Sequence, residues 1–155
     1  MKSSVERVVE ALAVAGITTE VKEFAESTRT AEEAAAAIGV TVGQIVKSLV
    51  FLSGSQAILA LVSGPNRASR QKLAALMDAE SIVQPDADTV RRLTGFSIGG
   101  IPPVGHTTTL PTFCDPDLLQ YPVVWAAAGT PHAVFSISPA QLVALCEAQV
   151  ADICQ

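Results

Sequence analysis

The sequence predicts one α/β (α+β) domain over residues 1–155, with a mixed, partly barrel-like β-sheet surrounded by helices. Its length of 155 residues fits a single domain. Hydrophobic residues make up 49% of the chain and charged residues 16%, which excludes a disordered protein and supplies a buried core. Helical and strand patterns alternate, and some strands are joined by tight turns, so a mixed sheet fits better than a doubly wound fold.

The first forty residues predict a helix, a strand and a second helix. Apolar residues recur at helical spacing between residues 3 and 16. Over residues 17–22, apolar and polar residues alternate, as in a half-buried strand. Thr30 and Glu33 then have the spacing of a capping box before an alanine-rich segment that Gly39 can end, which indicates a helix.

The remaining elements are two hairpins and three helices. Residues 45–52 and 57–62 are apolar and flank a turn, so they predict two central strands. Amphipathic helices are expected over residues 69–78 and 88–94, with a short apolar segment at 81–83 between them and a strand at 96–98 after them. A second hairpin is expected from residues 123–128 and 133–137, and Ser138 and Pro139 begin the last helix.

Charge and composition limit the possible functions. Ten Lys and Arg against fifteen Asp and Glu give a net charge of -5, so any nucleic-acid site must be local. No apolar run is long enough to span a bilayer, and we expect a cytoplasmic protein without membrane or DNA contact. The cysteines Cys114, Cys146 and Cys154 form no C-x-x-C pair and are expected to be reduced core residues. Neither a metal site nor a cofactor is expected, because clustered Cys and His ligands are missing.

Lys47 is unusual because it interrupts the apolar segment 45–52. In a strand it would share a face with Ile45, Leu49 and Phe51. An unpaired buried ammonium is costly, so Lys47 either extends to water along its stem or meets an anion such as a phosphate or an oxyanion.

A loop rich in glycine and proline covers residues 99–106. Glycines let a backbone approach a ligand and expose its N–H groups, while paired prolines make a loop rigid. Such a loop can form an oxyanion hole or a carbonyl clamp, or it can be a tight connection within the sheet. A P-loop and a serine-nucleophile elbow are both missing from the sequence.

Three other places in the sequence allow either a functional or a purely structural interpretation. His106 and His132, the only histidines, lie beside Gly and Pro, where each can be an acid or base or a turn residue. The segment 28–30 precedes a helix, where it can hold a phosphate or cap the helix beside a solvated Arg29.

Taken together, these segments resemble the YbaK/prolyl-tRNA-synthetase-associated domain family of aminoacyl-tRNA deacylases. In chain order the similar segments are residues 28–30 with the alanine-rich helix, 44–49, 99–105, 128–131 and 138–142. Lys47 matches the lysine central to activity in that family, and Gly99 and Pro103 match its G-x-x-x-P substrate loop. The other expected substrate-binding residues are Thr28, Arg29, Ser48, Gly100, Ile101, Pro102, Gly105, His106, Gly129 and His132.

The resemblance implies an enzyme that removes a small amino acid, such as Cys, Ala or Ser, from the 3′ end of mischarged, proline-type tRNA in trans. Backbone N–H groups of the loop would polarise the ester carbonyl, and Lys47 would hold a phosphate or offset developing charge. The cysteinyl-tRNA branch has basic residues where this chain has residues 106–109, and an acidic residue where it has Val134 and Phe135. Because residues 106–109 lack those basic side chains, a synthetase or another tRNA-binding partner is expected to help bind the tRNA. The alternatives are a noncatalytic module that binds the CCA end or a synthetase, and a binder of small metabolites.

Overall fold

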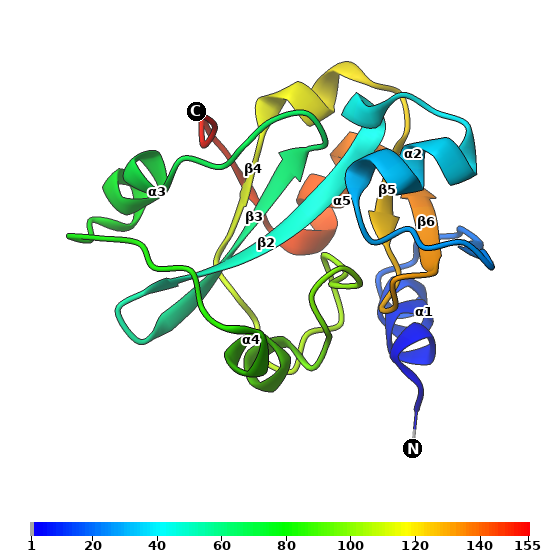
Figure 1. The fold of residues 1–155 in the computed structure, drawn as a ribbon, viewed down its shortest axis with the longest axis horizontal. Coiled ribbons are helices and arrows are strands. Elements are labelled where there is room, and N and C mark those ends of the chain that lie inside the picture. Colours follow the sequence, from blue (N-terminus) through cyan, green and yellow to red (C-terminus); the bar gives the residue numbers. More distant parts are fainter. Residues whose placement is uncertain (1) are drawn as a thin grey trace.

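The computed structural model describes residues 2–155 and has a seven-stranded sheet at its centre (Figure 1). The strand order is β1-β6-β5-β2-β3-β4-β7. The strands are β1 (Val21–Glu23), β2 (Ile45–Ser53), β3 (Gln56–Ser63), β4 (Thr112–Cys114), β5 (Val124–Ala127), β6 (Ala133–Ile137) and β7 (Gln149–Val150). Pairs β1–β6, β2–β3 and β5–β6 are antiparallel, whereas β2–β5, β3–β4 and β4–β7 are parallel. The predicted mixed sheet and both predicted hairpins are confirmed.

Five α-helices and two 3-10 helices accompany the strands within residues 2–155. They are α1 (Ser4–Val14), α2 (Ala31–Ile38), α3 (Arg70–Met77), α4 (Ala87–Thr94), α5 (Pro139–Cys146), η1 (Val42–Gln44) and η2 (Pro116–Gln120). Each α-helix begins after a Ser, Thr or Asp whose side chain accepts a hydrogen bond from a first-turn N–H. The predicted capping box at Thr30 and Glu33 is present. These local signals explain why all five predicted helices are confirmed.

Two strand predictions are wrong in part or in whole. The alternating segment 17–22 is a strand only from Val21, where it pairs with Phe135 of β6. Residues 96–98 are not a strand, because α4 ends at Thr94 with Gly95 as its C-cap, and a turn follows in which the Gly100 N–H donates to the Ser97 carbonyl. Strands β4 and β7 escaped prediction because they are too short to show a period.

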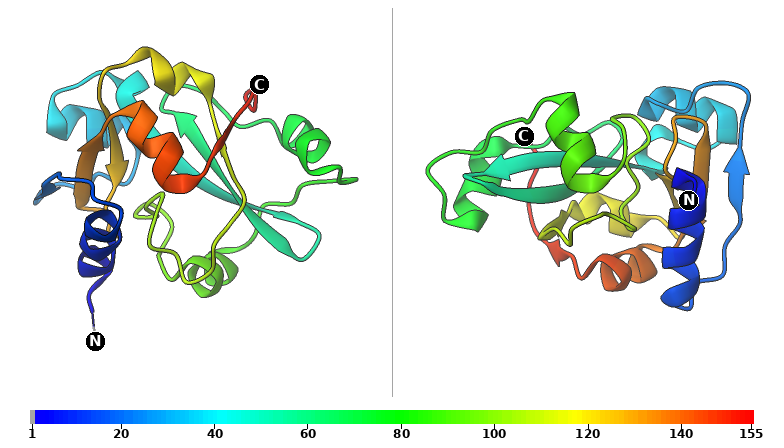
Figure 2. Two further views of the ribbon diagram at one scale, coloured as in Figure 1. Left: turned by 180° about the vertical axis from the view of Figure 1, so that it is seen from behind. Right: turned by 90° about the horizontal axis from the view of Figure 1, so that it is seen from below.

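Helices cover both faces of the sheet (Figure 2). Residues Val46 and Val50 of β2 join the main core, together with buried residues of α1, α4 and α5. Phe51, on the opposite face of β2, packs with Leu73 of α3 in a second core. Ile45 packs against the alanines of α2. Neighbouring residues of β2 therefore face different helices.

Candidate functional site

The candidate site is a cavity of about 1030 Å³ at the place where β2 leaves its neighbour β5. Only Ile45 and Val46 of β2 pair with β5, at Trp125 and Ala126. Beyond them β2 continues to Ser53 with β3 on one side, so its other edge is open. The cavity is lined by β2, the amino-terminal turn of α2, the turn after β3, residues 84–85, and residues of α4, β5 and the loop 98–101.

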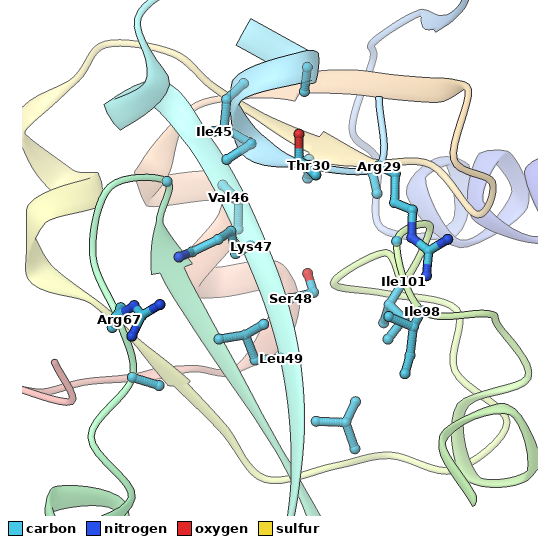
Figure 3. A pocket seen from close by; sticks show the side chains of 18 of the residues that line it. Arg29, Thr30, Ile45, Val46, Lys47, Ser48, Leu49, Arg67, Ile98 and Ile101 are labelled. Carbon is cyan, nitrogen blue, oxygen red and sulfur yellow. The ribbon is translucent and has the colours of Figure 1, made fainter. Parts of the chain in front are cut away.

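Lys47 lies in β2 on the face that α2 and α3 cover, and its side chain points toward Arg67 (Figure 3). It is half-buried, and its ammonium donates a hydrogen bond to the Asn66 carbonyl. Burial lowers the pKa of the Lys47 ammonium from its ordinary value, although the nearby Glu32 carboxylate acts in the opposite direction. The side chain thus places a partly desolvated positive charge in the wall of the cavity.

A buried carboxylate fixes the turn that meets Lys47. Asp115 is 2% exposed and accepts hydrogen bonds from the Ser63 N–H at 3.1 Å and from the Asn66 side-chain amide at 2.8 Å. It also accepts from the Asp117 N–H at 2.9 Å. Burial by itself would raise the pKa of Asp115, but these donors outweigh it and lower that pKa. The ionised carboxylate therefore holds residues 63–66 in place.

Close packing explains the two glycines at the start of the 99–105 loop. A Cβ at Gly99 would lie 2.4 Å from the Arg29 Cγ, and Gly99 has a φ of 93°. A Cβ at Gly100 would lie 2.7 Å from the backbone of Thr130. Both glycines thus allow close contacts with neighbouring segments, and Gly99 also lines the cavity.

Arg7 of α1 holds this loop by hydrogen bonds to two backbone carbonyls, one before the loop and one at its end. Its guanidinium donates to the carbonyl of Gly95 at 3.0 Å and to that of Gly105 at 3.0 Å. It also lies over the Phe96 ring, 4.3 Å from the ring centroid. The loop is therefore fixed at positions on either side of its cavity-lining residues.

His106 belongs to the support of the loop rather than to the cavity lining. Its ring lies 5.8 Å from that of Phe96, and its Nε2 contacts the Pro102 carbonyl. Burial lowers the pKa of His106, and Arg7 acts in the same direction, while the contact with Pro102 opposes them. The ring is thus largely desolvated behind the loop.

The cavity brings together six of the predicted site residues: Thr28, Arg29, Lys47, Ser48, Gly99 and Ile101. The other seven do not line it: Gly100, Pro102, Pro103, Gly105, His106, Gly129 and His132. Pro102 and Pro103 are buried, so they support the loop and are not among the residues that face the cavity. His132 is exposed and its Nδ1 lies 3.0 Å from the Glu26 carbonyl.

Sequence reasoning missed Arg67 and Arg70, which also line the cavity. Together with Arg29 they give it an arginine-rich rim in a chain whose net charge is -5. The predicted hairpin could have indicated Arg67, because Arg67 follows the strand that pairs with the strand of Lys47. In the structure Lys47 of β2 pairs with Val62 of β3. Asp115 also caps η2, since its side chain accepts a hydrogen bond from the Asp117 N–H.

The cysteines have the properties of reduced, unreactive thiols. Burial raises the pKa of Cys114 to about 11 and those of Cys146 and Cys154 to about 12. All three are free thiols. Residues 2–155 contain no group of three His, Cys, Asp or Glu side chains placed to hold a metal ion. They also contain no helix that is long and apolar enough to cross a membrane.

Comparison with known proteins gives consistent results. The family model described as "Aminoacyl-tRNA editing domain" matches residues 25–145. The chain is 26% identical over 134 residues to the "Putative Cys-tRNA(Pro)/Cys-tRNA(Cys) deacylase EbsC" of Enterococcus faecalis, with 84% of this chain and 82% of that protein covered. It is 31% identical over 105 residues to the proline–tRNA ligase of Bacillus licheniformis, covering 65% of this chain but 18% of the ligase.

A solved structure shares the whole fold. The "Crystal structure of a putative trans-editing enzyme for prolyl tRNA synthetase" superposes with a TM-score of 0.94 at 51% identity, and the match covers 100% of this chain and 99% of that one. The family match and this superposition agree on the same type of domain.

Proposed function

Because the chain belongs to the family of aminoacyl-tRNA editing domains, we propose that it is an enzyme that hydrolyses the ester bond of mischarged aminoacyl-tRNA in trans. One observation carries the proposal: Lys47, Ser48, Gly99 and Ile101 line the same cavity. The residues that resemble the family's lysine and its substrate loop thus contribute to a single space.

The cavity offers two groups of the kind that ester hydrolysis needs. An aminoacyl ester is already activated, so it requires mainly a positioned attacking group and stabilisation of the developing oxyanion. The N–H groups of Gly99 and Ile101 have no hydrogen-bond partner within residues 2–155, whereas that of Gly100 is bonded to Ser97. Gly99 and Ile101 are therefore the cavity-lining residues of this loop whose N–H groups are available to polarise the ester carbonyl.

Lys47 acts through its charge. Its ammonium lies on the Arg67 side of β2, away from Ile101, so we assign it to a phosphate of the terminal nucleotides rather than to the carbonyl itself (Figure 3). Arg29 and Arg67 supply further positive charge at the rim. The attacking group is a water molecule or, for a cysteinyl ester, the thiol of the substrate.

The substrate proposed is a small amino acid, such as Cys, Ala or Ser, on proline-type tRNA. Similarity to proline–tRNA ligases and to a protein named as a trans-editing enzyme for prolyl-tRNA synthetase supports the choice of tRNA. The net charge of -5 opposes binding of a polyanion outside the arginine rim. A synthetase is therefore the proposed partner that delivers the tRNA.

The test is the release of amino acid over time from a matrix of mischarged tRNAs. Catalytic turnover of at least one mischarged tRNA, above the spontaneous rate, is the expected result. Failure to release any amino acid, with a folded protein and with the synthetase present, would overturn the proposal.

The second candidate is a noncatalytic module that binds the CCA end. It is favoured by the separation of the Lys47 ammonium from the 99–101 loop, on opposite sides of β2 (Figure 3). Tight binding of uncharged tRNA together with the absence of turnover in the same time course would select it.

A further inference from the structure

We propose that the open edge of β2 at Ser48 recognises the amino acid itself, by main-chain hydrogen bonds to its α-amino group and its carbonyl. This inference rests on the proposed function, since the ligand is an aminoacyl ester. It goes further because it assigns a binding site to the α-amino group, which distinguishes an α-amino acid from other acyl groups.

The direction of the backbone groups in β2 follows from its neighbours. The Leu52 N–H donates to the Val83 carbonyl at 2.8 Å, and the Val83 N–H donates back at 2.9 Å. Leu52 thus directs both polar groups away from β3. Because backbone groups of a strand alternate between its two edges, Val50 and Ser48 direct theirs to the same side as Leu52.

The register of β3 gives the same result independently. Val50 pairs with Leu59, and the Leu59 N–H donates to the Pro111 carbonyl on the side of β4. Val50 and Leu59 are therefore a pair that exchanges no hydrogen bonds. The same holds for Ser48 and Leu61, because the Leu61 carbonyl accepts from the Asp115 N–H on the far side of β3.

Nothing within residues 2–155 completes this edge. Pairing with β5 ends at Val46, and the bridge to Val83 begins at Leu52. The N–H and carbonyl groups of Ser48 and Val50 therefore point into this gap, where neither the strand registers nor the turn and loop hydrogen bonds give them a partner. The gap is occupied by the cavity, whose lining includes Ala127 at the end of β5 and Gln84 after Val83.

The Ser48 side chain adds a third unsatisfied group. Its hydroxyl oxygen is fully buried and lacks a hydrogen-bond partner among the described residues. Figure 3 shows this side chain on the same side of β2 as Ile98 and Ile101. A buried hydroxyl without a partner is unfavourable, so the choice of Ser at this position of β2 is not explained by stability.

An aminoacyl ester has the complementary pattern. Its α-ammonium donates and its carbonyl accepts, and one carbon separates the two groups, as in a single residue of a β-strand. Ser48 can therefore bind it as a strand residue binds an antiparallel partner, with the Ser48 carbonyl accepting from the ammonium and the Ser48 N–H donating to the ester carbonyl. A carbonyl oxygen has two lone pairs, so it can accept from the Ser48 N–H and from a loop N–H together. The amino-acid side chain then faces Ile98 and Ile101.

The first test follows backbone amides by NMR while 3′-deoxy-3′-(L-alanylamino)adenosine, a non-hydrolysable amide analogue, is added. We expect the Ser48 N–H resonance to move downfield and its exchange with solvent to slow. The Leu52 N–H is the internal control, because it is already bonded to Val83. No change at Ser48 at millimolar analogue, or a change at Val50 without one at Ser48, would overturn the assignment.

The second test removes the α-amino group from the substrate. Propionyl-tRNA has the same carbon skeleton as alanyl-tRNA but no ammonium. Because the ammonium itself activates the ester, kcat/KM for each substrate is divided by the spontaneous hydrolysis rate of that ester, and this corrected rate should fall about ten- to a hundredfold. Equal corrected rates would overturn the inference while leaving deacylation itself established. If neither ester is released, the proposed function fails, and the amide shifts alone decide whether Ser48 binds the aminoacyl group.

Discussion

Two opposing effects act on the ammonium of Lys47. Burial removes part of its hydration and lowers its pKa, while Glu32 and the Asn66 carbonyl favour the charged form. A charge maintained against desolvation interacts strongly with an anionic ligand, because the low local dielectric weakens screening. Packing alone would be served better by an apolar residue at this position of β2.

Replacement of Lys47 by Ala is therefore expected to retain the fold and to lose most deacylation. Loss of one preorganised electrostatic group reduces kcat by about a hundredfold, or on the order of 3 kcal/mol. Lys47→Arg should also be impaired, because a planar guanidinium arranges its donors differently. The matched control is Lys72→Ala, since Lys72 pairs with Asp152 at 2.7 Å outside the cavity. Turnover at the wild-type rate by folded Lys47→Ala would refute the role.

Arg7 should act on the reaction through the loop that it anchors. Arg7→Met removes both hydrogen bonds, to Gly95 and Gly105, and Arg7→Lys retains the charge but cannot span the two carbonyls. We expect kcat to fall about tenfold or more in both variants, because small misplacement of a site is costly. Circular dichroism monitors folding, and Arg92→Met, on the exposed face of α4, is the control. An unchanged kcat in Arg7→Met would show that the loop does not need this anchor.

The turn between β3 and α3 depends on the carboxylate of Asp115. Asp115→Asn keeps the size of the side chain but turns an amide toward donors, so unfolding free energy should fall by roughly 2 to 3 kcal/mol. Asp117→Asn, at an exposed partner of Asn66, should cost less. Deacylation should also decrease in Asp115→Asn, because the turn carries the carbonyl that Lys47 contacts.

The pH dependence of stability distinguishes this role from simple packing. The pKa of Asp115 is lower in the folded protein than in the unfolded chain, so its contribution is complete above the unfolded value of about 3.9. It is lost as the pH falls through the folded pKa. Denaturant titrations of wild type and Asp115→Asn should therefore differ by a constant amount near neutral pH and converge in acid. A difference that persists unchanged in acid would contradict the assignment.

Elements with local signals could be predicted from the sequence, and elements that depend on distant partners could not. Each α-helix has a capping residue next to its own first turn, which explains the accurate helix boundaries. Strand β4 pairs with β3 some fifty positions earlier, as Cys114 does with Leu61, and no periodicity reveals such a pairing. The alternation at residues 17–22 was real, but β6 offers a partner only to residues 21–23.

The candidate site divides in the same way. Lys47 and the 99–105 loop stood out because a charge in an apolar strand and a cluster of Gly and Pro are unusual in a sequence. The support of the loop by Arg7 joins positions 88 and 98 residues apart, which only the folded chain shows. The open edge at Ser48 likewise results from where β5 and Val83 stop pairing with β2.

For the molecule as a whole, catalysis is expected to need neither a metal ion nor a thiol of the protein. Activity should survive EDTA, and it should survive simultaneous replacement of Cys114, Cys146 and Cys154 by Ala, with some loss of thermal stability because Cys114 is fully buried. Turnover before and after chelation is the measurement. Abolition by EDTA with recovery on addition of zinc would show that catalysis depends on a metal ion.

The cavity as a whole is too large to select amino acids by its volume alone. At about 1030 Å³ the cavity is larger than a small amino acid, so it has room for the terminal nucleoside as well. Size selection must therefore come from a local wall. Ile98 and Ile101 form an apolar side opposite Ser48, where a charged side chain would lose its hydration without gaining a partner (Figure 3).

We expect release of Ala, Cys and Ser, with overlap among them, and poor release of Phe, Lys and Glu from the same tRNA. An apolar pocket separates ligands by about 1 to 3 kcal/mol per methylene, and a wall supported by the buried Pro102 and Pro103 can exclude bulk more strongly. The measurement is a competition assay on one tRNA charged with each amino acid. Ile101→Ala should raise the release of Phe relative to Ala, because it removes bulk from the wall. Preferential hydrolysis of a bulky or charged ester by the wild type would refute this model even if deacylation were established.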